Sequence, residues 1–246
     1  MEALKKILVM LLACLLLAGC ASGTQAAPTP AYRQISQEQA RSMMAEDDGH
    51  LIVDVRRYDE YESGHIPGAI CIPNESIGET KPEELLNPNQ TLLIYCRTGN
   101  RSKQAAEKLA QLGYTAVYEF GGIVDWTGEV ASGQSLALTV ESNPTTGYSW
   151  SVEQEGACFA EQSVYVAAPQ DAPVAGAGGW QSFLFTPIAP GEAVLRFRYA
   201  RPWESNDDDI AVSVRLSVSE ALQITVLDDG GAQWEAAGYP PRLRVY

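Results

Sequence analysis

The stretch TLLIYCRTGNRSKQAAEKLAQLGY, residues 91–114, carries the clearest structural pattern in the first half of this chain. Its first five residues form a continuous apolar run of the length of a β-strand. Its second half places Ala105, Leu109 and Leu112 on one face of a helix. Gly113 follows in the position of a C-cap. A buried strand that a polar loop joins to an amphipathic helix is typical of an α/β fold.

Three further apolar runs have the same length and character. They are LIVDV, GAICIP and TAVYE, at residues 51–55, 68–73 and 115–119. Because these runs are continuous rather than alternating, they predict strands buried on both faces, as in a largely parallel sheet. A helix before them is expected to start at Ser36, with Gln39 completing a capping box, and to end at Gly49.

Cys96 follows the predicted strand directly and lies in the loop that enters the next helix. Backbone N–H groups of such a loop converge on an anion, and the helix dipole adds to their attraction. Since Arg97 and Arg101 are close by, we expect a thiol pKa below the ordinary value and a reactive thiolate. The alternative is a structural cysteine buried at a strand end, which is the usual role of a free cysteine.

Residues 32–130 resemble a single rhodanese domain, through the segments DVRRYDEYESGHIPGAICIP, YCRTGNRS and GYTAVYEFGGIVDW. The resemblance implies that Cys96 accepts a sulfane sulfur as a persulfide and passes it to a thiol or cyanide-like acceptor. It also implies a loop that cradles the persulfide and attracts an anionic donor such as thiosulfate, formed by Arg97, Thr98, Gly99, Asn100 and Arg101. Four other residues match the family's signature and are expected to brace the loops and the sheet: Asp54, Arg56, Glu62 and His65.

The length of the cysteine loop distinguishes sulfur from phosphate chemistry. Four residues separate Cys96 from Arg101, which gives the spacing C-x4-R. The related cysteine phosphatases have C-x5-R, because a phosphoryl group with its oxygens needs a wider ring of N–H groups. The shorter loop therefore favours sulfur transfer. A non-catalytic rhodanese-like scaffold that only binds a partner is the alternative, although such modules typically lack the loop cysteine.

From residue 131 to residue 230 the pattern changes to alternation. SLALTV, at 135–140, places apolar side chains on one face of a strand. The same alternation returns in WQSFLF, EAVLRFRY, IAVSVRLSV and ALQITVL, at 180–185, 192–199, 210–218 and 221–227. Turn-rich sequences separate these segments and no helical periodicity interrupts them, so the region predicts an all-β sandwich.

Three loops of this region, NPTTGY, GAGG and RPW, together resemble the chagasin family of cysteine-peptidase inhibitors. The resemblance implies an immunoglobulin-like sandwich whose three loops form a wedge that enters the active-site cleft of papain-like peptidases. The residues it assigns to the peptidase are Asn143, Pro144, Thr145, Thr146, Gly147, Gly176, Gly178, Gly179, Arg201, Pro202 and Trp203. One alternative is that these loops are plain turns with Trp203 in the core. Another is a β domain that only binds substrate proteins or envelope components.

The tail, residues 231–246, extends past the last strand of the chagasin resemblance. Members of that family usually have an extra strand before the one that carries the first loop, and the rhodanese-like segment ends too soon to supply it. RLRVY, at 242–246, is a candidate for the missing strand. Disorder of the tail is the alternative.

The N-terminus carries Lys5 and Lys6, then an apolar run from Ile7 to Ala18 that is short for a membrane span. LAGC, ending at Cys20, resembles the bacterial lipobox, which implies a signal peptide over 1–19 and a lipid on Cys20. Residues 20–31 then form a flexible tether, and the protein is expected at the cell membrane, outside the cytoplasm. An ordinary signal peptide or a plain anchor helix is the alternative.

Charge and cysteine usage exclude several other functions. The net charge of −14 argues against nucleic acid as a partner, because binding phosphates needs clustered Lys and Arg. Once Cys14 and Cys20 are assigned to the N-terminal signal, three widely spaced cysteines remain, which is no disulfide framework. With no CxxC pair and two histidines, no metal site is expected. We expect no cofactor beyond the covalent persulfide and the lipid.

Overall fold

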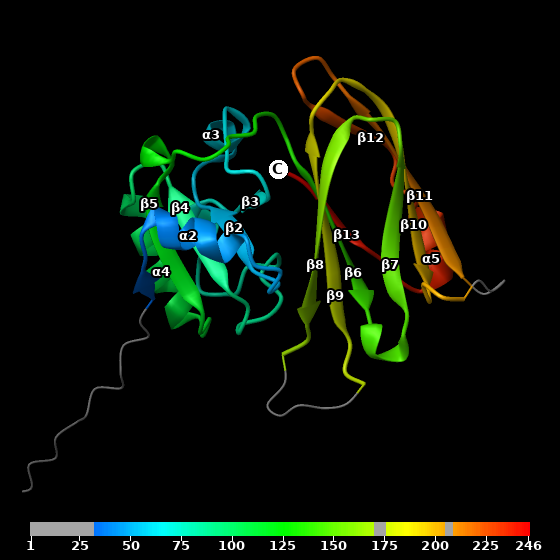
Figure 1. Cartoon of the computed structure of the whole chain (residues 1–246), viewed down its shortest axis with the longest axis horizontal. Helices are drawn as coiled ribbons and strands as arrows, with labels where there is room; N and C mark the ends of the chain where they lie inside the picture. Colours follow the sequence, from blue (N-terminus) through cyan, green and yellow to red (C-terminus); the bar gives the residue numbers. More distant parts are fainter. Residues whose placement is uncertain (1–31, 170–175, 205–208) are drawn as a thin grey trace, which may run out of the picture.

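The computed structural model describes residues 32–169, 176–204 and 209–246. An α/β domain and a β-sandwich lie side by side in Figure 1, which confirms the predicted fold class for both halves. The expected signal peptide, the lipidation at Cys20 and the tether lie outside the described residues.

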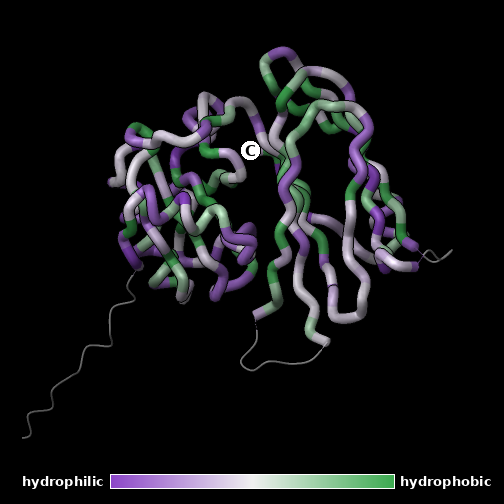
Figure 2. Tube along the Cα trace, viewed as in Figure 1, coloured by the Kyte–Doolittle hydropathy of each residue, from purple (hydrophilic) through white to green (hydrophobic). Residues whose placement is uncertain are grey.

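The α/β domain is built on a five-stranded sheet in the order β1-β5-β4-β2-β3, in which every paired strand is parallel. The strands are β1 (Arg33–Gln34), β2 (Leu51–Asp54), β3 (Ala69–Cys71), β4 (Leu92–Cys96) and β5 (Val117–Gly122). All residues of β3 and β4 are buried. This is the environment that continuous apolar runs require, and Figure 2 shows the hydrophobic residues gathered on such strands.

Three α-helices and two short 3₁₀ turns accompany this sheet among the described residues. They are α2 (Gln37–Met44), α3 (Tyr58–Glu62), α4 (Asn100–Gln111), η1 (Asn74–Ser76) and η2 (Ile123–Asp125). The capping box of Ser36 and Gln39 forms as predicted, but α2 ends at Met44, before the expected Gly49. Helix α4 packs Ala105, Ala106 and Leu109 against β4 and β5. Helix α3 is too short to leave a periodic signal in the sequence.

The sandwich consists of two four-stranded sheets, in the orders β12-β11-β10-β7 and β13-β6-β9-β8. The strands are β6 (Leu136–Ser142), β7 (Ser149–Glu155), β8 (Phe159–Ala167), β9 (Gly179–Pro187), β10 (Gly191–Ala200), β11 (Ile210–Val218), β12 (Ile224–Asp228) and β13 (Arg242–Val245). Their alternating apolar residues meet in a core that includes Leu138, Phe183, Phe197 and Val214. The sequence analysis missed β7 and β8, because most of their side chains are exposed and leave no clean alternation.

The tail is ordered as helix α5 (Gly231–Ala237) followed by β13. Of the two alternatives, disorder and an added strand, the structure has the strand: β13 pairs antiparallel with β6, the strand that leads into the first of the three loops. Helix α5 was not predicted. It is held by Trp234, which is buried in the sandwich core and donates its indole N–H to the carbonyl of Asp229.

The two domains share a packed junction. Tyr246 follows β13 but is buried in the core of the α/β domain, next to Tyr61. The Tyr61 hydroxyl lies 3.0 Å from the Ser135 hydroxyl, at the start of the sandwich. Arg244 of β13 forms ion pairs with Glu83 and Glu84 of the α/β domain. The last strand of the sandwich is therefore also a bridge to the first domain.

Candidate functional site

Cys96 is the last residue of β4, at the carboxyl edge of the parallel sheet. The register between β4 and β5 shifts just before it, which sets Cys96 opposite Gly122. The loop after it turns through Gly99, whose φ of 97° is a left-handed conformation that favours glycine, and α4 begins at Asn100. This turn points the backbone N–H of Gly99 at the Cys96 sulfur, 3.1 Å away.

The environment of the thiol favours its ionised form. Burial raises the pKa of Cys96, since its residue is only 1% exposed, but hydrogen bonds from Ser102 and from the backbone N–H groups of Thr98 and Gly99 lower it further than burial raises it. The pKa is therefore below its ordinary value, as predicted. Part of the cause is the expected one, the backbone N–H groups at the helix N-terminus, whereas the contribution of Ser102 was not predicted.

The five predicted loop residues are not equivalent. Arg101 is bound by Glu60 of α3, with two N–H···O distances of 2.7 and 2.8 Å, so its charge is largely compensated. Arg97, Thr98 and Asn100 are exposed, whereas Gly99 is buried beneath the thiol. Within the part of the chain that the structure describes, Arg97 forms no ion pair. It is the cation of this loop that is available to an anionic substrate.

Two buried polar residues beneath the loop were missed by the sequence analysis. Ser102, in the first turn of α4, is fully buried and donates its hydroxyl to Glu119 of β5 over 2.6 Å. Glu119 is itself only 3% exposed. The signal that could have found it is a carboxylate at the end of the otherwise apolar segment TAVYE.

The residues expected to brace the loops make buried contacts. Arg56 binds the Asp54 carboxylate through Nε and Nη2, at 2.9 and 2.6 Å, and donates to the carbonyl of Gly64. His65 stacks on Tyr61 with ring centroids 3.7 Å apart and an interplanar angle of 5°. Burial lowers the pKa of His65, so the ring is neutral and hydrogen-bonds the Tyr61 carbonyl through Nδ1. Glu62 receives the side-chain amide of Gln134 from the sandwich, at 3.3 Å.

Cys71 differs sharply from Cys96. It is fully buried in β3, and burial raises the pKa of its thiol far above the ordinary value. Its sulfur contacts the carbonyl of Arg56 at 3.6 Å. Cys71 is therefore a neutral core thiol. Cys71, Cys96 and Cys158 are all free, and the described residues contain no group of side chains that could hold a metal ion.

The three marked loops of the sandwich meet at one end. Asn143 of the first loop donates its side-chain amide to the carbonyl of Gly176 in the second, over 3.0 Å. Gly147 of the first loop lies against Trp203 of the third, so closely that an added Cβ would be 3.0 Å from the indole ring. Figure 1 shows this end, with the β6–β7 turn and the near ends of β8 and β9, at the bottom of the view.

The first loop is internally ordered. Pro144, Thr145 and Thr146 form the 3₁₀ turn η3, and Gly147 ends it with a φ of 86°. The hydroxyls of both threonines bond to Asn143, at 2.6 Å to its side-chain oxygen and 2.7 Å to its carbonyl. The loop therefore keeps its shape before any partner binds.

The second and third loops present backbone and an aromatic side chain. Gly179 begins β9 and packs so tightly on β8 that an added Cβ would lie 2.2 Å from the Val166 carbonyl oxygen, and Gly178 lies beside Asn143. Trp203, next to Pro202, is 73% exposed, which contradicts the alternative that it belongs to the core. The Arg201 guanidinium lies 4.8 Å from the Tyr148 ring centroid and pairs with Glu204. This end of the sandwich is a preformed, partly apolar projection.

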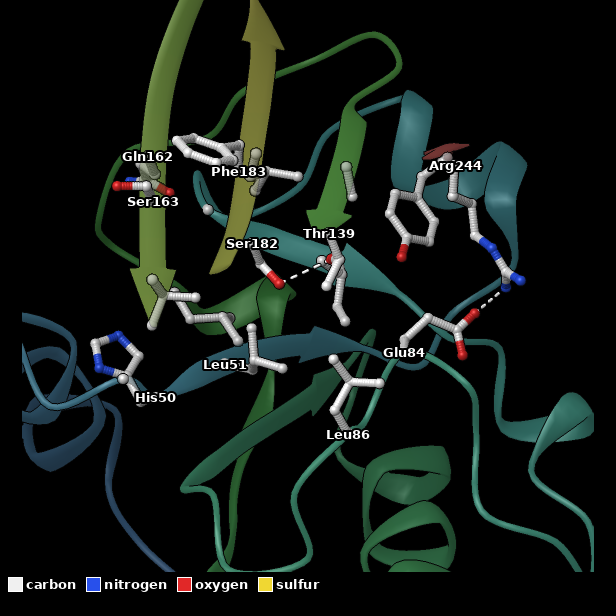
Figure 3. A pocket seen from close by; sticks show the side chains of 18 of the residues that line it. His50, Leu51, Glu84, Leu86, Thr139, Gln162, Ser163, Ser182, Phe183 and Arg244 are labelled. Carbon is white, nitrogen blue, oxygen red and sulfur yellow. Dashed lines mark hydrogen bonds and ion pairs between the residues drawn. The ribbon is translucent and has the colours of Figure 1, made fainter. Parts of the chain in front are cut away.

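A cavity of about 730 Å³ lies between the two domains and contains none of the predicted site residues. Figure 3 shows its lining, with His50, Leu51, Glu84 and Leu86 on the α/β side and Thr139, Gln162 and Ser182 on the sandwich side. The hydroxyls of Thr139 and Ser182 bond to each other, and Glu84 binds Arg244. Four of its polar side chains are thus paired with one another.

In the described part of the chain, no helix is long and apolar enough to cross a membrane.

Comparisons with known proteins assign both domains to families. The model of the rhodanese-like domain matches residues 36–129. The model of the chagasin family of peptidase inhibitors, I42, matches residues 129–218.

Several curated relatives match part of the chain, including these three. The thiosulfate sulfurtransferase GlpE of Pseudomonas entomophila (strain L48) is 36% identical over 110 residues, which cover 42% of this chain and 96% of that protein. The thiosulfate sulfurtransferase PspE of Escherichia coli (strain K12) is 38% identical over 73 residues, 30% of this chain and 70% of that protein. YrkF of Bacillus subtilis (strain 168) is 38% identical over 98 residues, which cover 39% of this chain and only 51% of YrkF.

Proposed function

Because this chain belongs to the rhodanese family through residues 36–129 and continues into a chagasin-family inhibitor domain, we propose that it transfers sulfane sulfur through Cys96 and inhibits papain-like cysteine peptidases. The single observation that carries the sulfur-transfer proposal is the Gly99 N–H aimed at the Cys96 sulfur, in a loop that lowers the pKa of the thiol.

The proposed reaction has two steps. The Cys96 thiolate attacks the outer sulfur of thiosulfate, the S–S bond of the donor breaks, and sulfite leaves with the bonding electron pair. The persulfide that remains on Cys96 carries a negative charge on its terminal sulfur, which the N–H groups of the loop stabilise. A nucleophilic acceptor, cyanide or a thiolate, then attacks that sulfur and regenerates the Cys96 thiolate. Arg97, exposed and without an ion pair among the described residues, would attract the anionic donor.

The test is a thiosulfate and cyanide assay that measures thiocyanate. Cys96→Ser is expected to abolish activity, because the hydroxyl is not ionised at neutral pH and forms no persulfide. Cys71→Ser, at the neutral core thiol, is the matched control and should retain it. Activity of the Cys96→Ser protein equal to that of the unchanged chain would reject Cys96 as the sulfur carrier, and inactivity of the unchanged chain would favour the scaffold alternative.

The proposed inhibition is blockade of the peptidase cleft by the three-loop end of the sandwich. Preformed η3 lowers the entropic cost of docking, since its hydrogen bonds already hold the loop. Trp203 exposes a large aromatic surface, and arginine and tryptophan are residue types that dominate binding hot spots. Its position against Gly147 joins the third loop to the first.

A titration of papain with the protein tests this half of the proposal. The unchanged chain is expected to inhibit reversibly at nanomolar concentration, and Trp203→Ala to weaken inhibition at least tenfold. Ile188→Ala is the matched control, because Ile188 is also exposed, at 61%, but follows the far end of β9. The Cys96→Ser protein should inhibit as well as the unchanged one. No inhibition at micromolar concentration would reduce the sandwich to a binding module for substrate proteins or the envelope.

The proposal includes a membrane anchor through a lipid on Cys20. It is supported by the LAGC sequence and the basic, then apolar, residues before it. Incorporation of labelled fatty acid into the expressed protein, and its loss in Cys20→Ser, is the expected result. Equal labelling of the two proteins would refute lipidation at this position.

A further inference from the structure

Glu119 is a buried carboxylate that the proposed reaction does not use. It lies on β5, beneath the Cys96 loop, and is 3% exposed. Within the described residues its side chain accepts three hydrogen bonds, two of which come from segments that hold that loop. Oε1 accepts the Ser102 hydroxyl at 2.6 Å and the Gly121 N–H at 2.9 Å, and Oε2 accepts the side-chain amide of Gln34 at 3.2 Å. A buried carboxylate is costly unless it is bonded in this way.

Two of these donors connect Glu119 to the two structures that hold the Cys96 loop: Ser102 to the start of α4, and Gly121 to the turn at the end of β5. Ser102 belongs to the first turn of α4, and its hydroxyl also lies 3.0 Å from the carbonyl of Gly99. Because a hydroxyl has one proton, the shorter contact to Glu119 takes it, and the hydrogen bond that Ser102 gives Cys96 is then that of its backbone N–H, beside those of Thr98 and Gly99. On this basis Ser102 acts on the thiol mainly by holding the helix start in place.

The second structure is the glycine turn at the end of β5. Gly122 is pressed against the loop, since an added Cβ would lie 2.4 Å from the Arg97 carbonyl oxygen and 2.7 Å from the Thr98 Cα. Gly99 lies next to Gly121, and the Val124 N–H binds the Arg97 carbonyl at 3.2 Å. The cysteine loop thus lies on this turn, residues 121–122, which we call the seat. Glu119 accepts the N–H of its first residue, Gly121.

We infer that Glu119 is a positioning residue for sulfur transfer: by bonding Ser102 and Gly121 at once, it fixes the helix start and the seat relative to each other, and so keeps the Gly99 N–H on the Cys96 sulfur. The role rests on the proposed reaction of Cys96. It depends on the hydrogen bonds that Glu119 accepts and not on its charge, because a negative charge near the thiolate opposes ionisation.

The test compares Glu119→Ala with Glu119→Gln by two measurements. The first is ultraviolet titration of the Cys96 thiolate, in a Cys71→Ala, Cys158→Ala background that removes the other free thiols of the described residues. The second is the thiosulfate and cyanide assay. Glu119→Ala is expected to raise the Cys96 pKa by about one unit, which lowers the thiolate fraction by up to about tenfold at a pH below that pKa, and to lower kcat about tenfold.

Glu119→Gln keeps an acceptor oxygen for Ser102 and Gly121, and the Gln34 amide can turn over to accept from its nitrogen. It is expected to keep kcat within about threefold and a Cys96 pKa no higher than that of the unchanged protein. Glu107→Ala, which removes an exposed carboxylate from α4, should change neither measurement. Ser102→Ala should also raise the pKa of Cys96. Adding Ser102→Ala to Glu119→Ala should reduce activity no further, because the two residues act through the same hydrogen bond.

The inference is overturned if Glu119→Ala titrates and turns over like the unchanged protein. It is equally overturned if Glu119→Gln loses as much as Glu119→Ala. If Glu119→Ala does not fold, as judged by circular dichroism, Glu119→Gln and Ser102→Ala decide the question alone. The thiolate titration needs no turnover, so an inactive but normally titrating chain would reject the proposed reaction without rejecting the positioning of the thiol.

Discussion

At the scale of single residues, the chemistry of the Cys96 loop depends on partners that are distant in sequence. Arg101 is 41 residues from Glu60, yet the two form the bidentate pair that joins the loop to α3. Arg97, four residues before Arg101, has no such partner among the described residues and is exposed. The same residue type therefore has two environments in one loop: Arg101 is paired with Glu60, and Arg97 is exposed, as the proposed attraction of an anionic donor requires.

The Glu60–Arg101 pair predicts a pH-dependent stability. The hydrogen bond from Arg101 lowers the pKa of Glu60 from 4.5 to about 2. Because the folded pKa is depressed, the stabilisation is fully present above pH 4.5 and is lost as the pH falls through about 2. Glu60→Gln should cost about 1–2 kcal/mol at neutral pH, less than the full shift implies, because solvent screens the partly exposed pair.

Chemical unfolding of the unchanged protein and of Glu60→Gln, from pH 7 down to pH 2, would measure the difference in their free energies of unfolding. This difference is expected to stay constant above pH 5 and to shrink below pH 4.5. Glu107→Gln, at an exposed position of α4, should show almost no difference at any pH. If the free-energy difference between Glu60→Gln and the unchanged protein does not change over this range, the Glu60–Arg101 pair does not stabilise the fold as proposed.

At the scale of elements, the packing of the β5 turn against the β4–α4 loop determines the site. Gly122 is opposite Cys96 in the sheet and leaves no room for a side chain. Gly122→Ala should therefore displace the backbone at Arg97 and Thr98, reduce sulfur transfer at least tenfold and destabilise the fold by about 1–3 kcal/mol.

Gly78→Ala provides the comparison, since an added Cβ there has no neighbour within 4 Å. The thiosulfate and cyanide assay and thermal unfolding would be measured for both variants. Full activity of the Gly122→Ala protein would mean that the loop adapts to the side chain, and that the seat formed by β5 is not required for its geometry.

At the scale of the whole molecule, β13 and Tyr246 make two domains into one unit. Strand β13 completes a sheet of the sandwich, while Tyr246 fills the core of the α/β domain and its backbone pairs with Ser135. The two proposed sites lie at different ends of this unit: α3, which binds the Cys96 loop, is at the top of Figure 1 and the β6–β7 turn is at the bottom.

Tyr246→Ala is expected to destabilise both domains together, by about 3–5 kcal/mol, the usual cost of truncating a buried aromatic side chain. Tryptophan fluorescence reports the sandwich, which holds four of the five tryptophans, and sulfur-transfer activity reports the α/β domain. In the Tyr246→Ala protein, the native fluorescence and the sulfur-transfer activity should be lost at the same temperature, and this temperature should be lower than in the unchanged protein. Trp203→Ala removes an exposed aromatic and should leave that temperature unchanged. Separate losses in the Tyr246→Ala protein would show that the domains are not coupled through this residue.

Local sequence patterns were enough to predict the two architectures and the position of Cys96. Continuous apolar runs identify β2, β3 and β4 because strands buried on both faces must be apolar throughout, and alternation identifies β6, β10 and β11 because one face meets a core. Cys96 was found because strand, loop and helix are consecutive in the chain, so that local sequence alone places the thiol at a helix N-terminus.

The surroundings of the thiol and the junction of the two domains depend on contacts that form only in the folded chain. Glu119 meets Ser102, and Glu60 meets Arg101, through contacts between segments far apart in the chain, which leave no periodic pattern to detect. The tail also depends on distant contacts. By its sequence alone, RLRVY is compatible with disorder, but in the structure β13 pairs with β6 and Tyr246 is buried in the α/β core. A strand has no stability of its own without a neighbour, so its place is decided by packing and not by local sequence.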